Sequence, residues 1–460
     1  MSLNGLLNTS YNSLQGFQFA IDLTGANIAN VNTPGYSRQR TVFQSEGTVD
    51  VASVQAQVGV QVSGVERIYD AYLSNQAVNQ SQMVGYSQAK SDVLDRIEGI
   101  FAENGGAASD MMNRFWNAWS GLATNPQGQI ERENVLAAAQ DMTAKFRGLD
   151  SALSGLVQDT DDNINNTIAQ VNDYLKQIAD LNKTIVANGA QDSGNSNILQ
   201  DRRSELLKQL SGLVDMNYVE DRNGAVNVFL ANGKPLILET NIYSLDVTHP
   251  NGLIAVVYLN DQNDNLNQAL SQGGKGKMAA LLETANTIVP DYKEKLNALA
   301  AAIIAEVNNQ HQAGYDNDGS RGSDFFTPAA EARNFQVSAA VSSNVNKIAA
   351  SASVNGDGDN ALALGAIKDK AAMGGGTVTI NDSYASLIGL IGRDVVNAKS
   401  SLDHQTSIMD QLSNRREATS GVSLDEEMMN LMKYQMAYNA SGKLVTTANQ
   451  MMDTLMGLVK

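Results

Sequence analysis

The two ends of this chain carry the same helical pattern. Over the N-terminal stretch, apolar and small side chains recur at alternating spacings of four and three residues, as far as the helix-ending sequence Thr33-Pro34-Gly35. This spacing is typical of the seam along which one α-helix packs against another in a coiled coil. The N-terminal seam consists of Leu3, Leu7, Ser10, Leu14, Phe17, Ile21, Thr24 and Ile28.

The C-terminal stretch has a seam of the same kind, preceded by Ser423 and Glu426 at the spacing that caps a helix. Because a single helix of about 26 residues is only marginally stable in water, we expect the two ends to pair as a coiled coil. The alternative is that they cap one internal bundle. The C-terminal seam consists of Leu431, Tyr434, Tyr438, Ser441, Val445, Ala448, Met452, Leu455 and Val459.

Further apolar side chains lie off both seams. They would stay exposed after the two ends pair, so we expect these faces to contact other copies of the chain. They are Leu6, Phe19, Leu23, Met429, Met436 and Met451.

Composition restricts the possible partners. The chain has 460 residues, with 32 Lys and Arg against 49 Asp and Glu, which gives a net charge of −17. Nucleic acids and anionic lipid surfaces require clusters of basic side chains, so neither is an expected partner. The absence of cysteine excludes disulfide bonds and thiolate chemistry. No apolar run is long enough for membrane insertion, and no cleavable signal peptide is apparent, so any export would use another route.

Between the ends, a helical period gives way to a period of two over residues 215–270, with turns at Asn223-Gly224 and Asn232-Gly233. This predicts a mainly α fold with a small inserted antiparallel β domain. The β domain is followed by a predicted helix over residues 277–312, in which Pro290 predicts a break or kink. Long helices are predicted over residues 72–101, 130–186, 198–213 and 382–420. The predicted domains are a terminal coiled coil (1–45 plus 424–460), a discontinuous helical bundle (46–214 plus 271–423) and an outer β domain (215–270).

The sequence contains no recognisable catalytic centre. His249, His311 and His404 lie far apart and fit no catalytic or metal-binding spacing, so we expect ordinary surface or packing roles. Acidic loops around Asp316 and Asp357 offer oxygen ligands, but neither has the EF-hand spacing, and turn formation explains them equally well. We therefore predict a protein without enzymatic activity, cofactor or metal site, although the pattern leaves metal binding at these two loops open.

The sequence from Asn27 to Arg38, Asn-Ile-Ala-Asn-Val-Asn-Thr-Pro-Gly-Tyr-Ser-Arg, resembles the N-terminal signature of bacterial flagellar axial proteins, the rod, hook and hook-associated group. C-terminal segments are similar to the last helix of the same group, and internal segments are similar to the hook-associated members. The signature residues are Asn27, Asn30, Thr33, Pro34, Gly35, Tyr36 and Arg38. The other matching segments are 420–427, 434–438, 446–452, 308–315, 324–326 and 359–364.

This resemblance implies a structural, self-assembling adaptor at the junction between flagellar hook and filament, outside the cell. It implies export through the flagellar type III apparatus, and it implies that Asn27, Asn30 and Tyr36 order the chain after the first helix. The implied partners are further copies of the chain, the hook protein, the next hook-associated protein toward the filament and an export chaperone. The alternatives are a hook or distal rod subunit, or an axial protein whose β insertion acts as an adhesin or enzyme.

Overall fold

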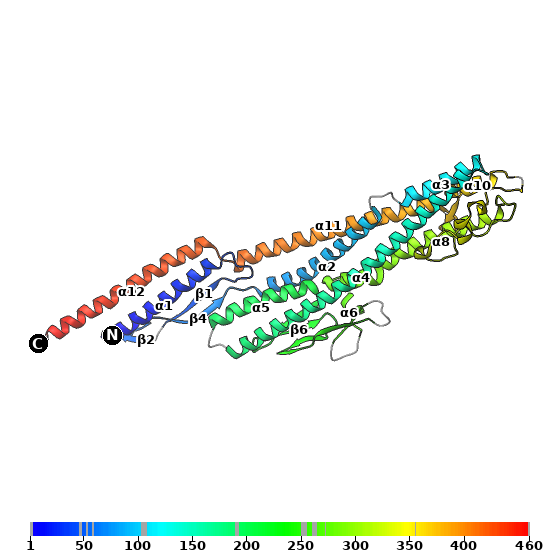
Figure 1. Cartoon of the computed structure of the whole chain (residues 1–460). Coiled ribbons are helices and arrows are strands. Elements are labelled where there is room, and N and C mark those ends of the chain that lie inside the picture. The colour runs from blue at the N-terminus through cyan, green and yellow to red at the C-terminus, as the bar shows by residue number, and fades with distance from the viewer. Residues whose placement is uncertain are drawn as a thin grey trace.

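The computed structural model describes residues 3–45, 48–51, 54–57, 59–102, 108–188, 193–249, 255–259, 265–271, 273–354 and 356–458. The molecule is long and mainly helical, and both termini lie at one end of it (Figure 1). The predicted fold class, mainly α with small antiparallel sheets and paired terminal helices, is confirmed. Val459, the last residue of the predicted C-terminal seam, lies outside the described residues.

The terminal pair consists of α1 (Leu3–Ala29) and α12 (Leu424–Leu458), which pack along each other. A ribbon of β1 (Gln39–Ser45) and β4 (Val60–Arg67) lies against α1, and β2 (Thr48–Val51) pairs with β3 (Val54–Gln57) beyond it. Phe43 of the ribbon contacts both helices, because its ring centroid is 5.7 Å from that of Phe17 and 6.0 Å from that of Tyr434. The ribbon therefore packs against both terminal helices.

Long helices form the rest of the rod: α2 (Ala71–Ala102), α3 (Ala108–Thr124), α4 (Gln129–Asn188), α5 (Ser193–Leu213), α8 (Val289–Ala313) and α11 (Ile380–Ser420). Helix α4 has 60 residues and is about 90 Å long. The predicted helices over 72–101, 130–186, 198–213 and 382–420 correspond to α2, α4, α5 and α11.

Two separate apolar cores stabilise the rod. The distal core, at the end opposite the termini, joins α3, α8 and parts of α2, α4 and α11, and includes the fully buried Trp116, Phe146 and Phe325. The middle core joins the second half of α4 and α5 to the β-strands, and includes Leu175, Leu210 and Val228. Helices α2 and α4 contribute to both cores, so they connect them rigidly.

The predicted β insertion forms an antiparallel sheet of β5 (Met216–Glu220), β6 (Val226–Leu230), β7 (Pro235–Leu238) and β8 (Asn241–Ile242), beside a hairpin of β9 (Leu245–Thr248) and β10 (Val256–Leu259). Val226, Val228 and Leu230 are buried, as the period of two predicts. They pack within the middle core together with α4 and α5. The division into three domains stays a prediction.

The helix break predicted at Pro290 takes the form of a π-helical turn. Helix α7 (Lys277–Glu283) continues into the π-helix η3 (Thr284–Ile288), where the Val289 N–H bonds to the Thr284 carbonyl, and α8 follows. Proline has no N–H and its ring clashes with the carbonyl four residues earlier in an α-helix. The wider turn just before Pro290 accommodates this missing bond.

The distal core is closed by short elements: η4 (Ala332–Asn334), α9 (Ala339–Ser343), η5 (Val345–Lys347), α10 (Asp359–Gly365), η6 (Ala366–Asp369), β11 (Ala371–Met373) and β12 (Val378–Thr379). Helix α6 (Asn267–Ser271) lies against the middle core. Buried polar side chains hold the irregular backbone of the distal end. Asn308 accepts the N–H groups of Phe325 and Phe326, and the Asn360 amide donates to the Ala349 carbonyl at 2.6 Å.

His311 is fully buried in the same region, and both ring nitrogens bind the backbone. Nδ1 lies 2.5 Å from the Ser323 carbonyl, which requires a proton on Nδ1, and Nε2 accepts the Ala349 N–H at 2.8 Å. The imidazole is therefore neutral. Burial lowers the pKa of His311 from its usual 6.5 to about 4, against smaller opposing effects of Ser323 and nearby acidic groups. The predicted packing role of this histidine agrees with these contacts.

We expect this histidine to make folding pH-dependent. Above pH 6.5 it is neutral in both the folded and the unfolded chain. Between pH 6.5 and 4 only the unfolded chain binds a proton, so the free energy of unfolding should fall by about 3 kcal/mol and then level off. Urea unfolding across this range measures the effect. His311→Gln should remove this component and the variant of the exposed His404, His404→Gln, should keep it; equal pH dependence in all three proteins would contradict the prediction.

Candidate assembly site

The signature residues meet at the joint where α1 ends, β1 begins and α12 begins. At its centre is Glu427, in the first turn of α12, whose side chain is only 2% exposed. Its carboxylate accepts the Asn27 Nδ2–H at 2.9 Å and the Arg38 Nε–H at 2.7 Å. Arg38 also pairs with Glu426, which is half-exposed. Residues 400 positions apart in sequence are thus joined directly.

Asn27 uses all the hydrogen-bonding capacity of its side-chain amide. Its Nδ2 donates to the Gln39 carbonyl at 2.8 Å as well as to Glu427, and its Oδ1 accepts the Gln39 N–H and the Tyr36 hydroxyl. Only an amide offers two donors and two acceptors in this geometry. Asn27 therefore fixes the return of the chain from α1 into β1.

Tyr36 remains a hydrogen-bond donor at any physiological pH. Burial, with the nearby charges of Asp201 and Glu427, raises the pKa of its phenol to about 12. The turn before it is held locally, because Asn30 accepts the Thr33 hydroxyl at 3.1 Å and its carbonyl accepts the Thr33 N–H at 2.9 Å. These contacts lie in the segment that the resemblance implies Asn30 and Tyr36 order, and this role stays a prediction.

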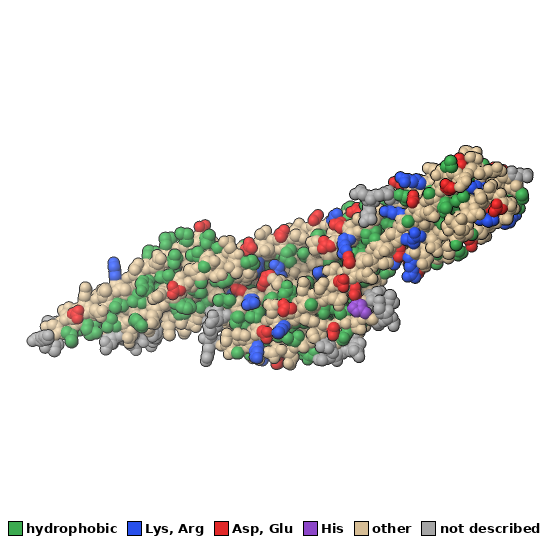
Figure 2. All heavy atoms as spheres, viewed as in Figure 1, with side chains coloured by type: hydrophobic (Ala, Val, Ile, Leu, Met, Phe, Trp, Pro, Cys, Tyr) green, Lys and Arg blue, Asp and Glu red, His purple; other side chains and the backbone are tan. Residues whose placement is uncertain are grey.

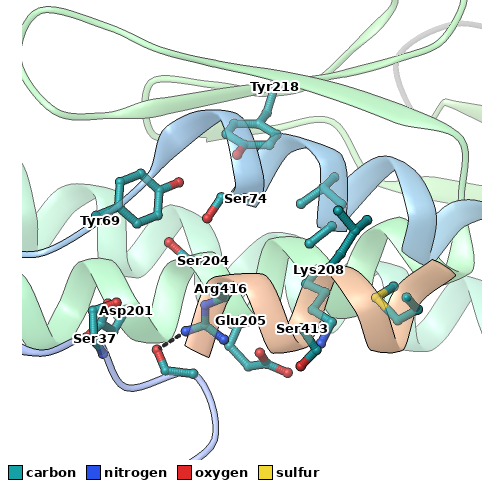
Figure 3. Close-up of a pocket in the computed structure, with 15 residues that line it drawn as sticks. Ser37, Tyr69, Ser74, Asp201, Ser204, Glu205, Lys208, Tyr218, Ser413 and Arg416 are labelled. Carbon is teal, nitrogen blue, oxygen red and sulfur yellow. Dashed lines mark hydrogen bonds between the residues drawn. The ribbon is translucent and has the colours of Figure 1, made fainter. Parts of the chain in front are cut away.

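The loop after the turn is bound by the body of the molecule. Gly35 has φ +82°, which favours glycine, and its carbonyl accepts a hydrogen bond from Arg416 of α11 at 2.8 Å. The Ser37 N–H donates to Asp201 of α5 at 2.9 Å, and Arg67 pairs with the same carboxylate at 3.0 Å. Figure 3 shows Asp201 and Arg416 approaching the loop from two different helices, beside a cavity of about 40 Å³.

Asp201 is almost fully buried, and burial raises the pKa of its carboxyl, while the Ser37 N–H and the Arg67 charge act in the opposite direction. A cavity of this size holds little more than one or two water molecules. Its lining serves to hold the chain together, and the site as a whole ties both terminal helices to α5 and α11.

The predicted seam residues lie along the terminal pair, at varied depth. The apolar members of the N-terminal seam are partly buried, while smaller side chains fill the closest contacts. In α12, Leu431, Val445 and Met452 are partly buried, whereas Tyr438 and Leu455 are 37% and 51% exposed. The role of the seam in assembly stays a prediction. The partly buried N-terminal members are Leu3, Leu7, Leu14, Phe17, Ile21 and Ile28; the buried small and polar positions are Ser10, Ser13, Gly16, Ala20, Thr24 and Asn27.

Several residues of the joint are absent from the sequence-based prediction. Glu427 has the ordinary appearance of an acidic residue in a first helical turn, where the helix dipole favours it. Asp201, Arg67 and Arg416 lie in segments far from the signature. The sequence did contain a signal for the buried face of α1. Small residues recur there at spacings of three and four, which indicates that another element packs closely against this face.

In both acidic loops the carboxylates are bound by groups of the protein. Asp316 accepts the N–H groups of Asp318 and Ser320, and the Lys347 ammonium lies 3.1 Å from Asp316 and 2.9 Å from Asp318. Asp357 accepts the Ser353 hydroxyl and N–H groups of its own turn, and these hydrogen bonds lower its pKa. Among the described residues, no cluster of three or more His, Asp or Glu is arranged to hold a metal ion. None of the helices described has the length and apolarity required to cross a membrane.

Comparison with known proteins agrees with this geometry. Residues 7–36 match the family of flagella basal body rod proteins, and residues 416–458 match the C-terminal family of flagellar basal body rod FlgEFG proteins. Both ends of the chain are thus similar to flagellar rod proteins. Residues 94–326 match the helical domain of flagellar hook-associated protein FlgK. The chain belongs to this FlgK family.

Curated relatives match along nearly their whole length. The chain is 27% identical to flagellar hook-associated protein 1 of Bacillus subtilis strain 168, over 97% of this chain and 96% of that protein. It is 24% identical to the protein of the same name from Salmonella typhimurium, over 99% and 100%. The solved flagellar hook junction protein FlgK of Burkholderia pseudomallei shares the fold, with a TM-score of 0.66 and 15% identity over 75% of this chain and all of that chain.

Because Glu427 is buried and Glu426 is exposed, we expect substitutions of these two adjacent glutamates to differ in their effect on the stability of the terminal pair. Glu427→Ala removes a buried acceptor from Asn27 and Arg38, so opening of the terminal pair should become easier by about 2 kcal/mol, or about 30-fold in hydrogen exchange of α1 and the start of α12. Glu426→Ala removes an exposed partner of the same arginine and should change exchange by less than about threefold. Equal effects of the two variants would show that burial of Glu427 is unimportant.

Proposed function

We propose that this protein is a non-enzymatic structural adaptor that assembles with copies of itself to join the flagellar hook to the filament. The observation that carries the proposal is the exposed apolar surface of α12, outside its contact with α1. Met429, Met432 and Met436 are 54–67% exposed on the side of the helix away from α1. Leu444, Met451 and Leu455, which flank the seam farther along the helix, are 50–51% exposed.

The concentration of exposed apolar side chains in α12 distinguishes it from the rest of the rod. Among the described residues, ten large hydrophobic side chains of this 35-residue helix are exposed, against two in the 60-residue α4. Figure 2 shows hydrophobic side chains gathered over the terminal helices. An apolar surface of this extent on a helix is typical of a protein interface. Of the six apolar side chains expected at the surface, Phe19, Met429, Met436 and Met451 are exposed, whereas Leu6 and Leu23 are partly buried.

The names of the relatives support a proposal for the partners. The relatives are named hook-associated proteins, and the solved relative is named a hook junction protein. We infer contacts with the hook protein on one side and with the next hook-associated protein on the other, export through the flagellar type III apparatus, and an export chaperone that covers α12 before assembly. The location is accordingly the extracellular part of the flagellum.

The hook or distal rod subunit remains the alternative, because both termini match rod-protein families. Electron microscopy of a strain lacking this gene separates the two roles. Hooks without filaments are expected for the junction protein, whereas absence of hooks would support the alternative.

The exposed face of α12 can be tested by charge. Met432→Glu combined with Met436→Glu places two carboxylates in the proposed interface, so assembly onto isolated hooks should weaken by more than about 100-fold because buried unpaired charges are costly. The fold should be unaffected, since both sites are exposed. The matched control is Ile388→Glu with Val396→Glu, at exposed positions of α11. Cosedimentation with hooks measures assembly; normal binding by the α12 variant would contradict the proposal.

A further inference from the structure

The methionines of this chain are concentrated on α12. Seven of the 16 methionines lie within these 35 residues. Six of them are 50–70% exposed: Met428, Met429, Met432, Met436, Met451 and Met456. Because the chain has no cysteine, thioether sulfur is the side-chain group most readily oxidised by two-electron oxidants.

Four methionines outside α12 are buried and provide a contrast within the same molecule. Met112, Met142, Met216 and Met278 lie in the two cores with no exposed surface. An oxidant in solution reaches the α12 sulfurs directly, but reaches these four only when a core opens. The structure therefore separates one reactive set from one protected set.

The exposed positions do not need methionine for folding. Leucine has a similar helix propensity and a similar size, so it would form the same helix and present the same apolar face. Methionine differs from leucine in two ways: its side chain is more flexible, and its sulfur can be oxidised reversibly. Flexibility alone would improve packing between subunits, and the experiment below distinguishes the two properties.

We propose that the six exposed methionines of α12 are an oxidation site that controls assembly, and the proposal rests on the function proposed above. A peroxide transfers one oxygen atom to the thioether. The S–O bond forms as the O–O bond breaks, the sulfur loses two electrons to the peroxide, and the leaving oxygen takes a proton to become water. The product is a methionine sulfoxide, which is a strong hydrogen-bond acceptor.

Sulfoxides at these positions oppose assembly because they exchange an apolar surface for polar groups. In a contact between helices each sulfoxide oxygen would be buried, and it costs free energy unless a donor faces it. The effect is limited to the unassembled chain, because contact with neighbouring subunits would cover the same sulfurs. The oxidised chain should keep its fold, since these side chains face solvent in the monomer.

The first measurement locates the reaction. The full-length purified chain is treated with limiting hydrogen peroxide and mapped by peptide mass spectrometry. The six α12 methionines should react at least tenfold faster than Met112, Met142, Met216 and Met278. Equal rates in the two sets would overturn the proposal.

The second measurement links oxidation to assembly onto isolated hooks. Oxidised chain should bind at least tenfold less than untreated chain, and methionine sulfoxide reductases should restore binding. A variant with leucine at all six positions should bind like untreated chain and keep this binding after peroxide. Unchanged binding of the oxidised chain, or loss of binding by the oxidised leucine variant, would overturn the inference alone. Failure of the untreated chain to bind hooks would overturn the proposed function and the inference with it.

Discussion

The Glu427 carboxylate, at the start of the last helix, is almost completely buried. A carboxylate removed from water costs free energy unless a positive charge and hydrogen-bond donors compensate it. The N-terminal segment supplies both partners, Asn27 from the end of α1 and Arg38 from the residue just before β1. Neither end of the chain satisfies this group alone. The pairing of the termini is therefore specified by polar groups at one point as well as by apolar packing along the helices.

The same joint extends into the body of the molecule. Asp201 of α5 binds the Ser37 backbone and Arg67, and Arg416 of α11 binds the Gly35 carbonyl. The orientation of the terminal pair relative to the rod is thus held by buried or half-buried contacts on two helices. The exposed apolar surface of α12, which we propose as the assembly surface, is in this way attached to the helices of the rod.

Patterns that act locally could be predicted from the sequence. The long helices, the alternating strands and the break near Pro290 all depend on periodicity or on backbone chemistry within a few residues. The partners of Glu427 and Asp201 could not be predicted, because they come from segments more than 130 residues away in the sequence. The seam predicted the contact between α1 and α12 only in part. The closest contacts are made by small residues such as Gly16 and Ala20, which contribute little to an apolar pattern.

The internal segments that resemble hook-associated proteins have a structural explanation of their own. Asn308, His311 and Asn360 satisfy backbone groups in the irregular distal end, where helices and sheets do not. Such a role is not visible in a linear sequence, because it depends on which carbonyl or N–H lies opposite each side chain. Their pattern points to architecture and not to a reaction.

The nested arrangement of the cores also determines the order in which the chain can fold as it leaves the ribosome. The middle core is complete once Leu282 is available, the distal core requires Ala398, and the terminal pair requires α12 itself. Helix α1 can contact the β1–β4 ribbon early, but its pairing with α12 must wait until almost the whole chain has been made. The terminal pair therefore closes after the two cores, and the face of α1 that packs against α12 stays uncovered until then.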